Sequence, residues 1–488
     1  MAKQKQRIRL GAILLAGLPL MAQAPAAQPI KIGNVVFQGS FRTRLEGWNW
    51  FQGEANESYA FSGNILRFGF SQQRKSFDWQ VEFAAPFLLR LPNDAIAPAP
   101  QLQFGLGGNY YSANKNSRDA GLIFPKQAFV RLKELFGDQA QSLRLGRFEF
   151  NDGTEATPAD PTLAALKRER VPQRLIGTFG FTHIMRSFDG AHYVYNLPKF
   201  NLTFVGALPT RGVFQVDGWG NLHTAFGYLA ATGQVPRAKS AGEWRLFGIY
   251  YHDWRNIVFT DNQSAAARRG NIANIRVGTF GGHYLHTAPT SAGPVDFLAW
   301  GALQTGRWGR QDHSGAIYAV EAGWQPKILP RLKPWINGGY SYSTGDKDPT
   351  DDKHQTFFQI LPTPRPYARF PFFNMMNNQD MSGMLTLRPH RAVKIRSEFH
   401  ALRLTSARDL WYLGGGAFQP WSFGYIGRPS NGARSLANLI DAGLDYSVNA
   451  KLSLSAYYGY AIGKSVIAAI YPKGKDGSLG YLELSYKF

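Results

Sequence analysis

Apolar and polar residues alternate along much of this chain in short segments. At the C-terminal end, Leu482, Leu484 and Tyr486 lie on one face of an extended segment, while Glu483 and Ser485 lie on the other. A period of two predicts a strand with one apolar and one polar face. The same alternation recurs at residues 41–46, 77–83, 394–400 and 452–460.

The alternation predicts eighteen strands. They fall near residues 36–50, 60–71, 76–88, 126–136, 141–150, 174–184, 190–197, 199–208, 242–254, 272–285, 294–305, 314–325, 332–343, 380–388, 392–404, 437–447, 451–462 and 478–488. An even number of strands that are apolar outside, polar inside and often end in an aromatic residue is typical of a bacterial outer-membrane barrel. A soluble sandwich or jelly roll is the alternative, although neither usually places so many such strands end to end. The predicted fold is therefore all-β, a closed antiparallel transmembrane β-barrel. Residues 101–111 are interpreted as loop because of their glycines.

The connections between these strands differ in length at the two ends. If both termini are periplasmic, the periplasmic turns are short and the extracellular loops are long, which is the asymmetry of outer-membrane barrels. The short turns are 71–75, 137–140, 326–331, 389–391 and 448–450, and the long loops are 89–125, 151–173, 344–379, 405–436 and 463–477. Residues 209–241 are an exception, long yet periplasmic. They form either a plug or gate, or the strand count is off by a pair there.

The N-terminus predicts export from the cytoplasm. Four basic residues, Lys3, Lys5, Arg7 and Arg9, precede a short apolar stretch that ends in Ala22-Gln23-Ala24. This is the pattern of a secretory signal peptide, and the stretch is too short for a membrane helix. We expect a signal peptide at residues 1–24, one barrel domain at 29–488, and a location in the outer membrane of a Gram-negative bacterium.

Charge and cysteine content narrow the function. The chain has 54 Lys and Arg against 33 Asp and Glu, and no Cys. The lack of Cys excludes disulfides, thiolate catalysis and Cys-ligated metals. The basic excess calls for a polyanionic partner or environment, and export argues against nucleic acid. Lipopolysaccharide phosphates are one such environment, which basic loop residues such as Arg268 and Arg269 would meet.

The polar faces of the predicted strands are rich in arginine. The alternation points these basic side chains into the barrel: Arg42, Arg44, Arg67, Arg131, Lys133, Arg144, Arg174, Arg245, Arg276, Lys394 and Arg396. Acidic residues expected on the same face are Glu46, Asp78, Glu82, Glu321, Glu398, Asp441 and Asp445. Guanidinium groups grip carboxylates in two-pronged fashion and enrich anions in a water-filled lumen. The acidic partners would hold the arginines in place and moderate their field. The alternative is that these charges only satisfy one another in a closed barrel.

Several motifs occur in a recognisable order between residues 145 and 488. They are Leu145–Gly153, Arg186–Ala191, Tyr342–Pro349 followed by Thr356–Gln359 and Leu361–Thr363, Phe399–Ala401 with Ala407–Tyr412, and Tyr458–Tyr460 with Tyr481–Phe488. In this order they resemble the alginate export family of outer-membrane barrels. The N-terminal third is supported by its pattern rather than by motifs.

The resemblance implies an 18-stranded barrel with an Arg-lined lumen that is narrowed by folded-in loops. In the best-known members, this lumen passes acidic polyuronate to the cell surface. The resemblance makes Arg147, Arg186 and Asp189 the first conduit candidates, followed by Arg408 and Asp409. The alternation places Arg147 on the outward face, so that either a bulge at Gly146 turns it inward or it lies at the rim. The family is broad, and membership does not fix the cargo.

We expect no enzymatic activity and no cofactor. The chain lacks a Gly-x-Ser-x-Gly elbow, a P-loop and a His-Glu-x-x-His motif. Asp346, Asp348, Asp351 and Asp352 form a weak calcium candidate in an outer loop, but their spacing differs from an EF-hand. A solvated acidic loop is the favoured interpretation.

Three hypotheses for function remain. The first is an anion-selective channel that exports an acidic exopolysaccharide of the alginate type. The second is an uptake porin for small anions such as phosphate, sulfate or organic acids, and the third is a plugged barrel that acts as an adhesin. The expected partners are anionic polysaccharide or small anions, outer-membrane lipid and lipopolysaccharide, and periplasmic export proteins.

Overall fold

The alternating segments pair with their neighbours to form one antiparallel barrel, which we describe from a computed structural model at residues 30–236, 240–363 and 368–488. Eighteen strands form its wall: β2 (Val35–Asn49), β3 (Ser58–Gln73), β4 (Phe77–Leu89), β6 (Phe124–Lys133), β7 (Gln141–Phe148), β8 (Phe188–Leu197), β9 (Phe200–Pro209), β10 (Thr224–Pro236), β11 (Ala241–Asp253), β12 (Ile275–Ala288), β13 (Val295–Trp308), β14 (Gln311–Trp324), β15 (Trp335–Ser343), β17 (Asn378–His390), β18 (Val393–Leu404), β21 (Ser435–Ser447), β22 (Leu452–Gly463) and β23 (Asp476–Lys487).

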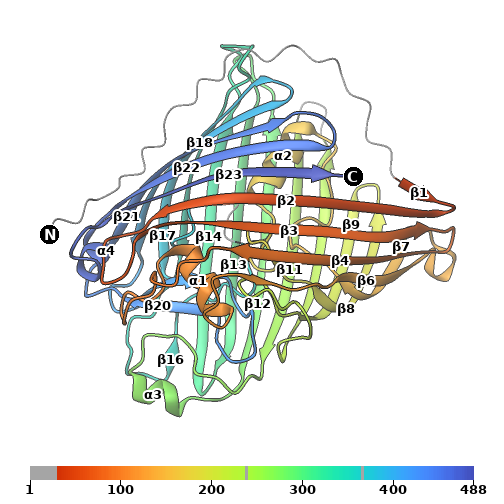
Figure 1. Ribbon diagram of the computed structural model, residues 1–488. Coiled ribbons are helices and arrows are strands. Elements are labelled where there is room, and N and C mark those ends of the chain that lie inside the picture. The colour runs from red at the N-terminus through yellow and green to blue at the C-terminus, as the bar shows by residue number, and fades with distance from the viewer. Residues whose placement is uncertain (1–29, 237–239, 364–367) are drawn as a thin grey trace.

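The first and last wall strands close the barrel. β2 pairs with β23 from Ser40 opposite Lys487 to Asn49 opposite Ser478, and the two run side by side in Figure 1. Closure leaves no free strand edge, so that the backbone hydrogen bonds of the wall are satisfied within the sheet, as a bilayer requires. No helix of the described residues has the length and hydropathy to cross a membrane.

The two faces of the wall follow the predicted alternation. Leu45 is 56% exposed whereas its neighbour Glu46 is fully buried, and Leu246 is 64% exposed whereas Arg245 is fully buried. Apolar side chains thus cover the outside, where lipid would meet them, and charged side chains face the lumen. Arg276 is an exception to the prediction, since it lies exposed on the outer face near the end of β12.

Two of the predicted strand assignments need correction. Residues 174–184 do not form a wall strand but belong to the connection between β7 and β8. The missing strand is β10, which lies within the exceptional segment 209–241 and pairs with β9 and β11. The total of eighteen is correct because these two errors cancel. Within 209–241, residues 224–236 are therefore wall and residues 210–223 connect β9 to β10, so that the described part of the segment is not a periplasmic plug.

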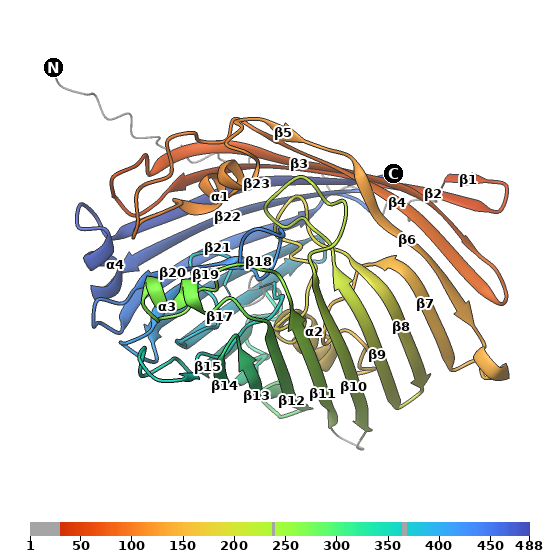
Figure 2. The same ribbon diagram turned by 90° about the horizontal axis from the view of Figure 1, so that it is seen from below.

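The remaining elements gather mostly at one end of the barrel, in the long connections (Figure 1). At this end lie α1 (Gly105–Ala113), α3 (Ala265–Gly270), α4 (Ser465–Ile470) and the short strands β5 (Ala120–Gly121), β16 (Lys353–His354), β19 (Leu410–Gly414) and β20 (Tyr425–Pro429). α2 (Pro161–Arg170) instead lies inside the barrel, and β1 (Ile30–Ile32) and a 3-10 turn at Leu135–Gly137 lie at the opposite end (Figure 1 and Figure 2). We call the two ends the loop end and the turn end. In outer-membrane barrels the short turns face the periplasm. The predicted signal peptide lies outside the described residues.

Candidate functional site

The connection 149–187 folds into the lumen and carries α2 with it (Figure 2). The helix begins at Pro161, where the Asp160 side chain accepts a hydrogen bond from the Leu163 backbone N–H at 2.8 Å. An aspartate N-cap followed by proline is a strong helix start. The sequence therefore held a signal for this helix, although residues 151–173 were expected only as an outer loop.

This connection brings cations to a carboxylate on the wall. Arg170 Nε lies 2.6 Å from Glu321 Oε2, and Arg174 Nη2 lies 3.2 Å from Glu321 Oε1. The Arg174 guanidinium also lies 4.9 Å from the centre of the Trp300 ring. Arg174 thus contributes to the lumen as predicted, but it does so from a loop rather than from a strand.

Two further clusters fix the same connection to the wall. Glu169 of α2 forms ion pairs with Lys394 Nζ, at 2.6 Å, and with Arg396 Nη1, at 3.2 Å. On the other side, Arg245 lies between Asp152, at 3.5 Å, and Glu155, at 3.2 Å. The predicted basic residues of both clusters therefore face the lumen and are neutralised there.

The two carboxylates beside Arg245 respond differently to burial. Burial raises the pKa of both groups. At Glu155 the Arg245 charge outweighs burial and leaves the pKa below its ordinary value. At Asp152 burial prevails over Arg245, and the pKa lies above its ordinary value.

The lumen cations of the first strands are also paired. Arg44 lies 3.1 Å from Glu46 and 2.6 Å from Glu483. Arg42 donates a hydrogen bond to the Gly180 carbonyl at 2.8 Å, so the misassigned segment 174–184 supplies acceptors to the wall. These contacts hold the loop against β2.

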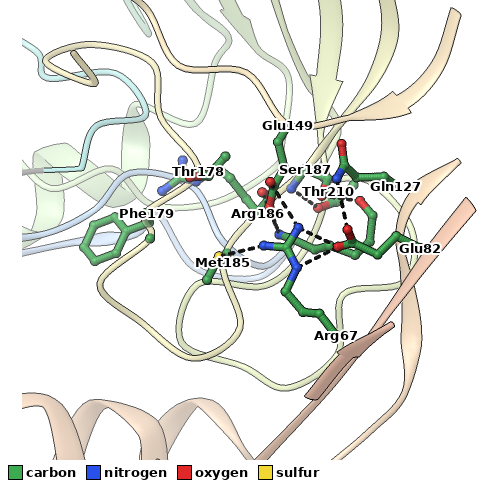
Figure 3. Close-up of polar contacts among 12 residues, drawn as sticks. Arg67, Glu82, Gln127, Glu149, Thr178, Phe179, Met185, Arg186, Ser187 and Thr210 are labelled. Atoms are coloured by element: carbon green, nitrogen blue, oxygen red, sulfur yellow. Dashed lines mark hydrogen bonds and ion pairs between the residues drawn. The ribbon is translucent and has the colours of Figure 1, made fainter. Parts of the chain in front are cut away.

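Arg67 sits between two carboxylates, one on the wall and one on a connection. Its guanidinium lies 2.5 Å from Glu82 and 3.2 Å from Glu149, as Figure 3 shows. Lys126, which the sequence did not single out, lies 3.5 Å from Glu149 on the other side. It is the extra residue of a bulge in β6, which explains why simple alternation does not reveal it.

Near the turn end, Arg131 and Lys133 both contact Asp78, with Lys133 Nζ at 2.9 Å. Arg144 behaves differently, because no described carboxylate forms an ion pair with it. Its guanidinium lies 4.7 Å from the Phe129 ring centre instead. Of the predicted arginines that face the lumen, only Arg144 has no ion pair and no side-chain hydrogen bond with the described residues.

Arg147 and Asp189 do not face the lumen. They are register partners on β7 and β8, and Arg147 Nε lies 2.7 Å from Asp189 Oδ1. Arg147 lies opposite the exposed Ala128 of β6, and the β6–β7 pairing runs through Gly146 without a shift. The bulge that would turn Arg147 inward is therefore not present, and the pair lies on the outer face near the loop end. As conduit candidates, Arg147 and Asp189 are misplaced.

Arg186 is fully buried between connections rather than exposed to the lumen. Its guanidinium donates one hydrogen bond, to the Gly415 carbonyl, and its Nε and Nη1 have no hydrogen-bond partner among the described residues. Burial lowers the pKa of Arg186 to about 10. Figure 3 places it beside Ser187 and Thr178, close to the Arg67 cluster.

The neighbouring residues Arg408 and Asp409 have different environments in the structure. Arg408 is exposed at the loop end, whereas Asp409 is buried and accepts hydrogen bonds from the Thr356 hydroxyl at 2.6 Å and the Tyr412 hydroxyl at 2.7 Å. Burial raises the pKa of Asp409 to about 6. Asp409 also accepts from the Asp346 backbone N–H at 2.9 Å. It fastens two long connections to each other.

The carboxylates of the acidic outer loop 346–352 accept hydrogen bonds from the backbone of the same loop. Asp346, Asp348 and Asp351 each accept a backbone N–H about two residues ahead, at 3.0 Å. Such local hydrogen bonds are typical of Asx turns. The described residues contain no group of three or more His, Asp or Glu side chains placed to hold a metal ion.

The model of the alginate export family matches residues 93–466, well over half of the chain. The chain belongs to the alginate export family. With a closed barrel as its fold, this family member is an outer-membrane channel. A search of curated proteins returned no match.

Solved structures share the fold at low sequence identity. Outer membrane protein OpdK of Pseudomonas aeruginosa aligns with a TM-score of 0.54 and 9% identity, covering 93% of this chain and 98% of OpdK. OccK9 (OpdG) of the same organism gives 0.55 and 10%, with the same coverage. OccAB2 of Acinetobacter baumannii gives 0.55 and 8%, covering 92% of this chain and 98% of that one. OpdK has also been solved with vanillate.

Proposed function

We propose that the protein is an anion-selective channel that exports an acidic exopolysaccharide of the alginate type. Membership in the alginate export family supports the class of cargo. The observation that carries the proposal is the distribution of charge between the lumen and the turn end.

The turn end is strongly basic. We define the turn rim as the exposed cations in or beside the short turns, namely Arg74, Lys75, Lys199, Lys327, Arg331, Lys333, Arg388, Arg391 and Lys487. None of them belongs to an ion pair found among the described residues. The only carboxylates in the described turns are Glu134 and Asp138. An uncompensated ring of one sign raises the local concentration of the opposite ion.

The loop end is charged but partly balanced. A half-buried ion pair joins Arg211 to Asp217 there and an exposed one joins Arg307 to Asp312, and the acidic loop lies at the same end. Since the short turns of such barrels face the periplasm, the stronger attraction for a polyanion lies where exported cargo would enter. This asymmetry favours export over uptake.

The paired lumen arginines suit transport of a polymer. A guanidinium that already shares a carboxylate attracts a passing uronate only weakly, so that no single position traps the chain. The connection 149–187 lies in the lumen, and the proposal therefore requires that it shifts during passage.

Uptake of small organic anions is the second candidate. It is favoured by the filled lumen and by a cavity of about 340 Å³ at the loop end, which has the size of a single small molecule. The structure of OpdK with vanillate, a barrel of the same fold, is consistent with this candidate.

The test is the reversal potential of the purified protein in a planar bilayer under a salt gradient, with polymannuronate added to one side at a time. We expect anion selectivity and polymer block at lower concentration from the turn side. Anion selectivity with no block from either side would favour the small-anion porin. Cation selectivity would contradict both, and absence of conductance after deletion of the long loops would favour a plugged adhesin.

A further inference from the structure

A cavity at the loop end is lined mostly by residues of the connections. Its volume is about 340 Å³, near the lower limit of roughly 300–1,000 Å³ for small-molecule sites. Aromatic side chains from separate connections line it, among them Trp50, Phe179, Phe214, Phe423 and Tyr425. Such walls favour a flat or weakly polar ring.

One charged residue lines this cavity. Arg428 is 1% exposed, and none of the described lining residues carries a carboxylate. Arg428 donates hydrogen bonds to the carbonyls of Gln101, at 2.7 Å, and Gln103, at 2.9 Å. Its Nη1 has no hydrogen-bond partner among the described residues. A buried cation without a counter-ion is costly, and a bound anion would relieve that cost.

A second cation lies behind the same wall. Arg186 contacts the Gly415 carbonyl, and its guanidinium lies 5.9 Å from the ring centre of Phe179, which lines the cavity. Like Arg428, it forms no ion pair among the described residues. Arg255, which also touches the wall through the Ser422 carbonyl, is instead neutralised by Asp253 at 2.6 Å. The field in the cavity is therefore positive.

Neutral hydrogen-bonding groups complete the lining. Gln103, Asn109, Ser112, Gln419 and Ser422 all border the cavity. The Gln419 amide oxygen has no hydrogen-bond partner among the described residues. Together with the aromatic walls, these groups suit a ring that carries hydroxyl or similar substituents.

We propose that this cavity binds a six-membered ring bearing one carboxylate, with the ring against the aromatic walls and the carboxylate on Arg428. The inference deepens the proposed function, on which it rests for the view that the solutes are anions. Such a ring has two sources, a uronate unit of a polymer or a free aromatic acid. Both present the same chemistry to the site.

The test is binding to the purified full chain in detergent, followed by tryptophan fluorescence and calorimetry. The probes are dimannuronate and benzoate, with mannobiose and benzamide as neutral analogues. We expect one or both acids to bind more tightly than their neutral analogues. Binding by dimannuronate alone would identify the uronate source, and binding by benzoate alone the aromatic acid.

Two variants examine the site separately. Arg428→Met should weaken acid binding roughly tenfold to a hundredfold, the range expected for loss of a charge-assisted hydrogen bond, and should leave neutral analogues unaffected. Ala113→Trp, which fills the cavity without removing Arg428, should abolish binding of either acid, and it covers the case in which Arg428→Met does not fold. Ala450→Trp, at an exposed position in a turn at the opposite end, is the matched control.

Three results would overturn the inference. The first is equal binding of acids and neutral analogues, and the second is acid binding that survives Ala113→Trp. A folded protein that binds neither acid would overturn it as well. The proposed function stands or falls separately, since its conductance assay on Ala113→Trp reports anion selectivity and polymer block from the turn side whether or not the cavity is filled.

Discussion

The lumen and the turn rim hold their cations in opposite ways. In the lumen, arginines such as Arg44, Arg67 and Arg245 each contact at least one carboxylate within 3.2 Å. At the turn rim, exposed cations such as Lys327 and Arg331 belong to no ion pair among the described residues. A basic excess read from composition therefore does not reveal where charge is available. Paired lumen charge fastens loops to the wall, whereas rim charge is free to attract a ligand.

The largest effect is expected from unpairing a lumen charge. Glu321→Gln removes the carboxylate that Arg170 and Arg174 share, whereas the longer contact of Arg170 with Glu398, at 3.7 Å, remains. We expect a loss of about 3–5 kcal/mol in the free energy of unfolding, as for other broken buried pairs. The measurement is guanidinium unfolding of the refolded barrel, followed by tryptophan fluorescence.

The matched control is Glu54→Gln, which breaks the exposed pair with Lys473 at the loop end. An exposed pair contributes about 0–1 kcal/mol, so this variant should unfold like the wild type. Equal stability of the two variants would mean that the lumen pairs do not fasten the connection 149–187.

Sequence alternation predicted the wall well where the two faces differ in polarity, and failed where they do not. β10 was missed because its inward residues Phe226, Tyr228 and Ala230 are as apolar as its outward Leu229. These residues pack against loop rather than water, so that the polar half of the pattern is lost. Residues 174–184 were misassigned for the converse reason, because a buried loop also alternates apolar residues with small polar ones.

The site was less predictable than the wall. Arg42, Arg44 and Arg67 were placed correctly since strand geometry fixes their direction. The motif residues Arg186 and Arg408 lie in connections, where sequence spacing carries no such information. The pairing of these residues depends on contacts between segments far apart in the chain, such as that of Asp409 with Thr356.

Asp409 differs from the carboxylates that pair with lumen arginines. It is buried in a connection, and its contacts are hydrogen-bond donors rather than cations. Burial raises its pKa from 3.8 to about 6. Its stabilising contribution is therefore complete below pH 4 and is lost as the pH rises through about 6, a change of about 3 kcal/mol. We expect the stability of wild type relative to Asp409→Asn to fall across this window and to be level above it.

The measurement is the unfolding free energy of both proteins at a series of pH values from 4 to 8. If the stability of wild type relative to Asp409→Asn rises with pH, the hydrogen bonds from Thr356 and Tyr412 outweigh burial. The pKa of Asp409 would then lie below its ordinary value, and the group would be ionised in the folded protein. The subtraction removes the titration of all groups that the two proteins share.

Neutralising part of the turn rim should change transport without changing stability. In the triple variant Lys327→Gln, Arg331→Gln, Lys333→Gln, we expect polymannuronate block from the turn side to slow by about tenfold at low salt, within the range of electrostatic steering. The effect should fade above 0.1 M salt, where the screening length is about 10 Å. Rates of block in a planar bilayer provide the measurement.

The control removes three cations at the other end, through Arg268→Gln, Arg269→Gln and Lys347→Gln. This variant should leave block from the turn side unchanged. Equal slowing by both variants would mean that total charge governs block rather than its position, and the contrast between rim and lumen would lose its functional meaning.

The smallest expected effect separates two arginines on one strand. Arg144 and Arg147 both belong to β7, but Arg144 faces the lumen without an ion-pair partner among the described residues, whereas Arg147 lies on the outer face with Asp189. Arg144→Ala should shift the reversal potential toward cation permeation, by less than the rim variant does because one charge is lost rather than three. Arg147→Ala should leave the reversal potential unchanged. A shift with Arg147→Ala alone would place that residue on the conduction path and would contradict the register of β6 and β7.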